Sequence, residues 1–214
     1  MKVYGFWRSS AAYRLRIALA LKGLSYDYVS VHLTKGEQNQ PEYGAINPQQ
    51  LVPVMEEDGQ RLYQSLALIQ YLEETHPEPP LIPADPVAAA RVRSLALIVA
   101  CEIHPLNNPR VLNYLTSTFG ITDEQRRKWY HHWIQVGFSA LEKRLAGETG
   151  TGRFCHGNTP GLADICLVPQ VANAKRFKVD LALFPTILRI NDECVQLEPF
   201  QQAAPENQPD AEKS

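Results

Sequence analysis

The sequence predicts two domains of different classes, a small α/β domain followed by an all-helical domain. Within residues 2–33, hydrophobic periodicity indicates a strand, a helix and a second strand. Residues 77–86 (PEPPLIPADP) contain five prolines and cannot lie inside a helix or a central strand. Strand-like segments almost disappear after these prolines, and the 214-residue chain is long enough for two modest domains.

The first domain begins with a β-α-β unit. Residues 2–6 (KVYGF) are rich in β-favouring side chains and predict a strand. In residues 11–22 the apolar positions recur with helical spacing, and Gly23 supplies a stop signal. Residues 26–33 (YDYVSVHL) alternate as a half-buried strand does. Such a unit favours two parallel strands joined by a right-handed crossover.

Less regular segments complete this domain. Residues 34–50 are polar and indicate a loop with a short helix. Short runs at 52–55 and 61–63 flank an Asp-Gly dipeptide, which predicts a hairpin. An amphipathic helix follows over residues 65–76. The predicted order is therefore β-α-β-α-β-β-α within residues 1–76.

The rest of the chain is dominated by helical periodicity. The segments with this pattern are 87–103, 111–119, 124–145, 163–174 and 187–197. Thr122 and Gln125 have the spacing of a capping box for the third of them. We expect an α/β domain at 1–76, a linker at 77–86, a helical domain at 87–205 and a mobile polar tail at 206–214.

The composition excludes several classes of function. A net charge of −2 argues against wholesale binding to nucleic acid or to a membrane surface. No apolar run approaches the roughly 20 residues that span a bilayer, and we expect no signal peptide because Met1 leads directly into the predicted first strand. The four cysteines lack zinc-ligand spacing, so we expect reduced thiols in a cytoplasmic protein and no metal site.

Arg8, Ser9 and Ser10 lie between the first strand and the first helix. In a β-α-β unit this position is the carboxyl edge of the sheet, where ligands commonly bind. The N-terminus of a helix also carries unpaired N–H groups and partial positive charge, which attract anions. A serine there either caps the helix or donates a hydrogen bond to a bound anion, and spacing alone leaves both alternatives open.

Two further dipeptides allow a similar choice of interpretation. Val52-Pro53 precedes the hairpin. A trans proline at the start of a strand is the simpler interpretation, whereas a cis proline would present the Val52 backbone to an extended peptide. Gln64-Ser65 opens the helix after the hairpin, where Ser65 can cap that helix or help to hold a carboxylate.

Four segments together resemble the zeta class of the glutathione transferases. They are RSSAAYRLRIALALKG (8–23), NPQQLVPV (47–54), QSLALIQYLEE (64–74) and LADICLVPQVANAKRFKVDL (162–181). The resemblance covers residues 1–205. It implies a thioredoxin-like N-terminal domain, a helical C-terminal domain and a homodimer. It also implies that glutathione is the cofactor of a cis–trans isomerase in aromatic compound catabolism, which converts maleylpyruvate or maleylacetoacetate to the fumaryl isomer.

The resemblance further implies roles for single residues. Ser9 would donate a hydrogen bond to the thiol sulfur, with Ser10 beside it. Val52, followed by a cis Pro53, would pair with the glutathione backbone. The remaining implied contacts come from polar side chains, namely Gln49 or Gln50 at the glycyl end and Gln64 and Ser65 at the γ-glutamyl end.

The substrate of such an isomerase carries two carboxylates, so cationic side chains are expected in the site. Arg8 and Arg110 are candidates, and Arg176 matches a family arginine assigned to substrate binding. His104 and Asn108 are polar candidates for contacts with the cofactor, on one face if the helix continues through both. Surface ion pairs for Arg110 and Arg176, and a structural role for His104, are the alternatives.

The chain also departs from the family pattern. Ala11 stands where the family usually has cysteine, and Tyr13 where it usually has tryptophan. Ser9 and the helix N-terminus can activate a thiol without that cysteine, and its absence favours maleylpyruvate slightly over maleylacetoacetate. Gly161 occupies a cap position that is usually Ser or Thr, although Asp164 can still reach the Gly161 N–H.

Two other functions would use the same fold. A zeta-class transferase acting on small electrophiles such as α-halo acids would use the same thiolate. A non-catalytic binding module would keep the fold without the chemistry. The intact set of Ser9, Val52-Pro53 and Gln64-Ser65 speaks against this last alternative.

Overall fold

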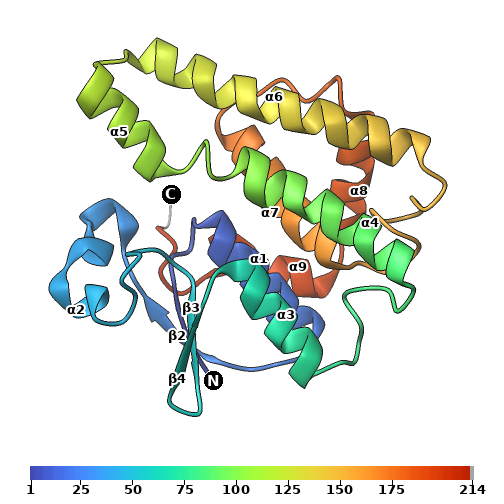
Figure 1. Ribbon diagram of the computed structural model, residues 1–214, viewed down its shortest axis with the longest axis horizontal. Coiled ribbons are helices and arrows are strands. Elements are labelled where there is room, and N and C mark those ends of the chain that lie inside the picture. The colour runs from blue at the N-terminus through green and yellow to red at the C-terminus, as the bar shows by residue number, and fades with distance from the viewer. Residues whose placement is uncertain (213–214) are drawn as a thin grey trace. The chain divides into compact units, whose positions relative to one another are not determined.

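The computed structural model describes residues 1–212 (Figure 1). By their internal contacts these residues form two compact units. The first contains Met1–Leu81 together with the C-terminal segment that starts at Gln196, and the second contains Ile82–Val195. The first unit is α/β and the second is helical, so the predicted fold class is confirmed.

The first unit is built on a four-stranded mixed sheet in the order β2-β1-β3-β4. Its strands are β1 (Lys2–Gly5), β2 (Asp27–Ser30), β3 (Val54–Glu57) and β4 (Gln60–Tyr63). β1 and β2 are parallel because a helix carries the chain back between them, whereas β3 is antiparallel to both β1 and β4. Asp58 and Gly59, both with positive φ, form the turn of the predicted hairpin.

The helices of the first unit pack around α1. They are α1 (Ser10–Leu21), α2 (Pro41–Gly44), α3 (Ser65–Thr75) and α9 (Glu198–Ala203), with single 3₁₀ turns at Leu33–Lys35, Glu37–Asn39 and Pro205–Asn207. Both α3 and α9 pack against α1 (Figure 1). Gly5 is required in β1 because a Cβ there would lie 2.9 Å from Cε2 of Tyr28.

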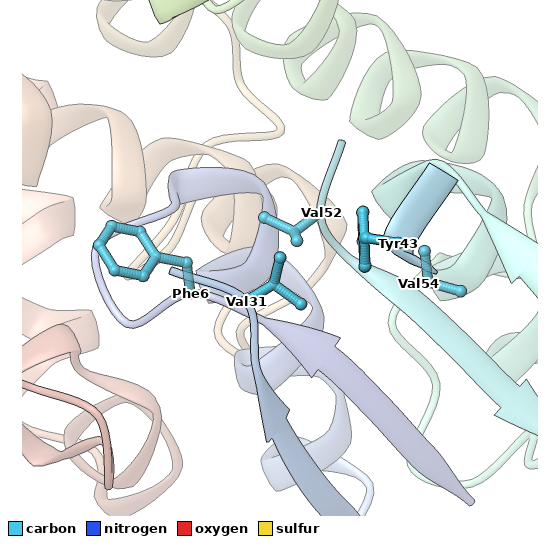
Figure 2. Packing of buried hydrophobic residues seen from close by; sticks show 5 residues of the cluster. All are labelled: Phe6, Val31, Tyr43, Val52 and Val54. Atoms are coloured by element: carbon cyan, nitrogen blue, oxygen red, sulfur yellow. The ribbon is translucent and has the colours of Figure 1, made fainter. Parts of the chain in front are cut away.

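A hydrophobic cluster fixes the strand ends from which the candidate site extends. Figure 2 shows its buried members, Phe6, Val31, Tyr43, Val52 and Val54. They come from the residues directly after β1 and β2, from α2, and from the beginning of β3 and the segment before it. Burial of each such side chain contributes roughly 1.5–3 kcal/mol, so the core itself holds the loop after β1 and the segment before β3.

The second unit is organised around α7, a helix that is buried over most of its length. Its helices are α4 (Pro86–Leu97), α5 (Pro109–Phe119), α6 (Asp123–Gly147), α7 (Leu162–Arg176) and α8 (Pro185–Val195), with a π-helical turn at Ile98–Ile103. Every residue of α7 from Leu162 to Val171 is buried, and α4 and α8 pack against it. The predicted capping box is confirmed, with Thr122 Oγ1 accepting from Gln125 N and Gln125 Oε1 accepting from Thr122 N.

Asp164 ties the loop before α7 to the start of that helix. Its Oδ2 accepts from Gly161 N at 2.9 Å, as the sequence predicts. Its Oδ1 accepts from Cys155 N at 2.8 Å, a contact that the sequence did not indicate. The side chain is 1% exposed. Burial raises the pKa of this carboxyl group, and the two backbone donors act in the opposite direction.

The C-terminal end of the helical domain differs from the expected boundary at residue 205. The last helix of the second unit ends at Val195, and the chain from Gln196 joins the first unit. Phe200 and Ala203 of α9 are buried where α9 packs along α1. A helix of six residues is too short for its periodicity to reveal which domain covers it.

The expected mobile tail at 206–214 is also largely ordered. Pro205–Asn207 forms a 3₁₀ turn, and the Asp210 carboxylate accepts a hydrogen bond from Trp7 N at 3.1 Å. The tail is polar and sparse in apolar residues, so its composition predicts mobility, whereas a specific carboxylate contact fixes it. Residues 213–214 of the expected tail lie outside the described residues.

Residues 1–212 contain no helix that is both long and apolar enough to cross a membrane. The same residues contain no group of three or more His, Cys, Asp or Glu side chains placed to hold a metal ion. Cys101 is exposed, Cys155, Cys166 and Cys194 are buried, and all four are free thiols.

We expect Asp164→Ala to lower the free energy of unfolding by about 2–4 kcal/mol, because the buried N–H of Cys155 and the partly buried N–H of Gly161 lose their acceptor. Urea denaturation followed by circular dichroism measures the change. Asp123→Ala, at the exposed start of α6, is the matched control and should cost less than about 1 kcal/mol. Equal destabilisation by the two substitutions would contradict the role assigned to Asp164.

Candidate functional site

Ser9 occupies the N-cap of α1, at the turn after β1. Its backbone is extended, with φ −71° and ψ 119°, and its Oγ accepts from Ala12 N at 3.3 Å. The capping alternative is therefore confirmed. The hydroxyl hydrogen has no acceptor among residues 1–212, and a hydroxyl can accept and donate at once. Capping thus leaves Ser9 able to donate to an anion at the helix N-terminus.

Ser10 is the first residue of α1 and differs from Ser9 in exposure. Its residue surface is 8% exposed, whereas Ser9 is half-buried. A ligand outside the turn therefore has easier access to the Ser9 hydroxyl. Exposure thus favours Ser9 over Ser10 for contact with a ligand, and the assignment of Ser9 to the thiol stays a prediction.

Arg8 places a guanidinium beside two aromatic rings. Its Cζ lies 5.4 Å from the ring centroid of Trp7 and 5.9 Å from that of Phe6. No carboxylate within residues 1–212 forms an ion pair with it. Aromatic faces orient a guanidinium without using its N–H donors, so those donors are available to an anionic ligand.

Gln49 and Gln64, both expected at the cofactor, are brought together. Gln64 Nε2 donates to Gln49 Oε1 at 2.7 Å, and Gln49 N donates to the buried Asn47 side chain at 3.0 Å. Gln64 has φ 68° and Gln50 has φ 56°. Non-glycine residues with positive φ cost about 1–3 kcal/mol each and concentrate at binding sites. One of these two residues bonds to Gln49 and the other, Gln50, follows Gln49 in the chain, which supports a binding role for this edge of the first unit.

Ser65 is the first residue of α3, and the expected possibility that it caps this helix is wrong. The N-cap position is Gln64, whose side chain makes no capping hydrogen bond. Ser65 is buried, and its Oγ accepts from Arg14 Nη1 at 3.2 Å. Arg14 is itself 3% exposed, so a buried guanidinium links α1 to the start of α3. The sequence analysis missed Arg14, although an arginine among the apolar residues of a short helix was a usable signal.

The Val52–Pro53 peptide bond is cis, as the family resemblance implies. The simpler interpretation of a trans proline is therefore wrong. Val52 is buried in the cluster of Figure 2, and the preceding carbonyl, of Leu51, accepts from Tyr43 Oη and Asn47 Nδ2. Within residues 1–212 no hydrogen bond reaches the N–H or C=O of Val52 itself. This backbone is open to an added extended peptide.

The segment between the π-helical turn and α5 carries the polar candidates of the second unit. His104 follows that turn, and Asn108 is the N-cap of α5, where its Oδ1 accepts from Arg110 N at 2.9 Å. The helix does not continue from His104 to Asn108, so the shared helical face considered for them is absent. Pro105 and Pro109 explain the break. Arg110 is exposed at the first turn of α5.

Arg176 ends α7 and is held by two aromatic residues. Its Cζ lies 4.9 Å from the ring centroid of Phe177, which in turn stacks on Tyr130 at 3.8 Å. Burial raises the pKa of Tyr130 to about 12, and a hydrogen bond with Arg176 acts in the opposite direction. Sequence analysis missed Tyr130 because nothing in its local pattern distinguishes it from a core residue.

Each unit builds its own part of the predicted set. The first unit carries the residues expected for catalysis and glutathione binding, namely Arg8, Ser9, Ser10, Gln49, Gln50, Val52, Pro53, Gln64 and Ser65. The second unit carries His104, Asn108, Arg110 and Arg176.

The first unit matches a known family. Residues 1–74 match the model of the glutathione S-transferase N-terminal domain. A relative named "Probable maleylacetoacetate isomerase" from Vibrio cholerae is 49% identical over 211 residues, which is 98% of this chain and 97% of that protein.

Solved structures agree over the whole chain. A holo structure of maleyl pyruvate isomerase, described as a bacterial glutathione S-transferase of the zeta class, is 50% identical with a TM-score of 0.97 and covers 99% of this chain and 100% of that chain. A maleylacetoacetate isomerase from Methylobacterium extorquens AM1, with bound malonate and glutathione, is 44% identical with a TM-score of 0.97 and full coverage of both chains.

A thioredoxin-like sheet followed by a helical unit, with an N-capping serine after the first strand, is the architecture of a glutathione transferase. The chain belongs to the zeta class of this family.

Replacing Ser9 tests how much its capping hydrogen bond contributes to stability. We expect Ser9→Ala to lower the free energy of unfolding by about 1 kcal/mol because α1 loses its N-cap. Ser9→Gly should cost only a few tenths of a kcal/mol, roughly, since glycine is tolerated at that position. Urea denaturation of both variants checks this. Equal stability of wild type and Ser9→Ala would contradict the capping contact.

Proposed function

We propose that the protein is a glutathione-dependent cis–trans isomerase that converts a maleyl keto acid, maleylpyruvate or maleylacetoacetate, to its fumaryl isomer. The observation that carries the proposal is the Ser9 hydroxyl at the N-terminus of α1, with its hydrogen available, in a chain about half identical over its full length to isomerases of both names.

Ser9 and the start of α1 are suited to stabilise a thiolate. A free thiol with a pKa of about 8.5 is only a few per cent ionised at pH 7, and lowering its pKa by about two units requires about 2.7 kcal/mol. A hydrogen bond to a charged group contributes about 1.5–3 kcal/mol, and a helix N-terminus about 0.3–1 kcal/mol. Together these two contributions are sufficient without a cysteine at the position of Ala11.

The first unit offers groups that fit the tripeptide. The N–H and C=O of Val52, next to Pro53, have no hydrogen-bond partner within residues 1–212, so they suit backbone pairing with an extended peptide. The polar edge that suits its two carboxylate ends comprises Gln49, Gln50, Gln64 and Ser65. When bound, glutathione supplies a thiolate that adds to the cis double bond, permits rotation and leaves again, so no redox cofactor is needed.

Cationic side chains suit a substrate with two carboxylates. Arg8 and Arg176 each lie against an aromatic ring that orients the guanidinium, and Arg110 is exposed at the start of α5. A planar guanidinium binds both oxygens of a carboxylate. The relative from Methylobacterium extorquens AM1 was solved with malonate, a dicarboxylate. His104 and Asn108 complete the proposed polar contacts to the cofactor.

We also propose that the protein works in the cytoplasm as a homodimer. Its four cysteines are free thiols, as is usual in a reducing compartment. The dimer follows from the family resemblance. Sedimentation of the purified protein, which should give twice the mass of one chain, tests the assembly.

Purified protein supplied with glutathione should convert maleylpyruvate, maleylacetoacetate or both, with loss of the enol absorbance of the cis substrate. Arg176→Ala should lower this turnover by roughly a hundredfold, because a charged hydrogen bond to a carboxylate is lost. The same variant should leave glutathione transfer to a neutral electrophile within about twofold of wild type.

The two assays together separate the isomerase from its alternatives. Turnover of neither maleyl acid by a wild-type protein that binds glutathione would overturn the proposal. Transfer to α-halo acids in that case would favour the transferase alternative. Absence of heat on titration with glutathione would favour the binding module.

A further inference from the structure

The carboxylate of Asp210 joins the C-terminal segment to the loop that precedes Ser9. Its Oδ2 accepts three hydrogen bonds, from Trp7 N at 3.1 Å, Tyr28 Oη at 3.1 Å and Ser30 Oγ at 2.9 Å. Tyr28 and Ser30 belong to β2, so one carboxylate connects the loop after β1 with the neighbouring strand. Hydrogen bonds to a charged acceptor are about twice as strong as those between neutral groups.

Arg16 binds the same loop through backbone carbonyls, whereas Asp210 binds it through an N–H group. Its residue surface is 1% exposed, and within residues 1–212 its guanidinium donates only to backbone carbonyls. Nη2 donates to Trp7 O at 2.9 Å, and Nε donates to Ala203 O, in α9, at 2.9 Å. The N–H and the C=O of Trp7 are therefore both bonded, one to Asp210 and the other to Arg16.

The Trp7 backbone controls where Ser9 lies. Only Arg8 separates the two residues, and Ser9 N donates to Phe6 O at 2.9 Å, which closes a tight turn around Trp7 and Arg8. Nη1 of Arg16 also reaches Phe6 O, at 3.5 Å. A shift of the Trp7 peptide would therefore move both the hydroxyl of Ser9 and the guanidinium of Arg8.

We propose that Asp210 is a positioning residue for the reaction, which acts through the Trp7 peptide to fix Ser9 and Arg8. This inference rests on the proposed function, because Ser9 and Arg8 are the groups that it serves. Arg16 fixes the carbonyl of the same peptide. The C-terminal segment is thus part of the catalytic scaffold of the first unit, even though it contributes no group to the reacting atoms.

The test uses three full-length variants. Asp210→Ala removes all three hydrogen bonds. Asp210→Asn keeps a carbonyl oxygen that can accept from Trp7 N, so it serves as the conservative rescue. Glu206→Ala is the matched control, because Glu206 is an exposed carboxylate in the same segment whose side chain makes no hydrogen bond or ion pair within residues 1–212.

We expect faster amide hydrogen exchange at Trp7, Arg8 and Ser9 in Asp210→Ala, measured without glutathione. We also expect kcat for isomerisation of the maleyl keto acid to fall by roughly ten- to a hundredfold. The pKa of the thiol of bound glutathione should rise, with the glutathione dissociation constant little changed. Asp210→Asn, whose neutral amide oxygen accepts more weakly than a carboxylate, should recover only part of the turnover, and Glu206→Ala should match wild type in all four measurements.

Two results would overturn the inference. One is unchanged exchange at these amides in Asp210→Ala. The other is faster exchange with wild-type kcat and an unchanged pKa of the bound thiol, which would mean that the contact is only structural. Because exchange and thiol pKa do not require a maleyl substrate, failure of the isomerase proposal alone would not produce either result. If Asp210→Ala does not fold, Asp210→Asn and Glu206→Ala must differ in kcat for the inference to stand.

Discussion

The turn between β1 and α1 must satisfy its own backbone and still present a hydroxyl to an anion. Ser9 meets both requirements because its oxygen caps α1 while its hydrogen stays available. The rest of the first unit serves this arrangement. The parallel pairing of β1 and β2 places the turn at the carboxyl edge of the sheet. Phe6, where the turn begins, is buried in the cluster of Figure 2.

Val52, like Ser9, combines a structural role with groups that are available to a ligand. Its side chain is buried in the core, while its backbone N–H and C=O have no partner in residues 1–212. Unpaired backbone groups are costly when buried, so such an edge is stable when water or a peptide ligand satisfies it. The positive φ values of Gln50 and Gln64 also cost free energy. Strain of that kind persists only where surrounding contacts enforce it.

Sequence patterns predicted the features that depend on residues close together in the chain. Periodicity identified the strands and helices, the Asp-Gly dipeptide identified the hairpin, and residue types identified the N-cap at Thr122, whereas capping by a serine at the start of α1 was one of two open alternatives. Contacts between distant residues were not predictable in this way. Asp210 lies 203 residues from Trp7, and the buried partner of Ser65, Arg14, is 51 residues away. The C-terminal segment is polar, as its sequence shows, but the mobility predicted from that composition is wrong for its described part.

The central claim is that the first unit lowers the pKa of the glutathione thiol through the Ser9 hydroxyl. The direct measurement is the ultraviolet absorbance of the bound thiolate as pH is varied. The account predicts a bound-thiol pKa near about 6.5 in the wild type and at least about one unit higher in Ser9→Gly, which keeps α1 stable. A wild-type value near that of free glutathione, or no difference between the two proteins, would contradict it.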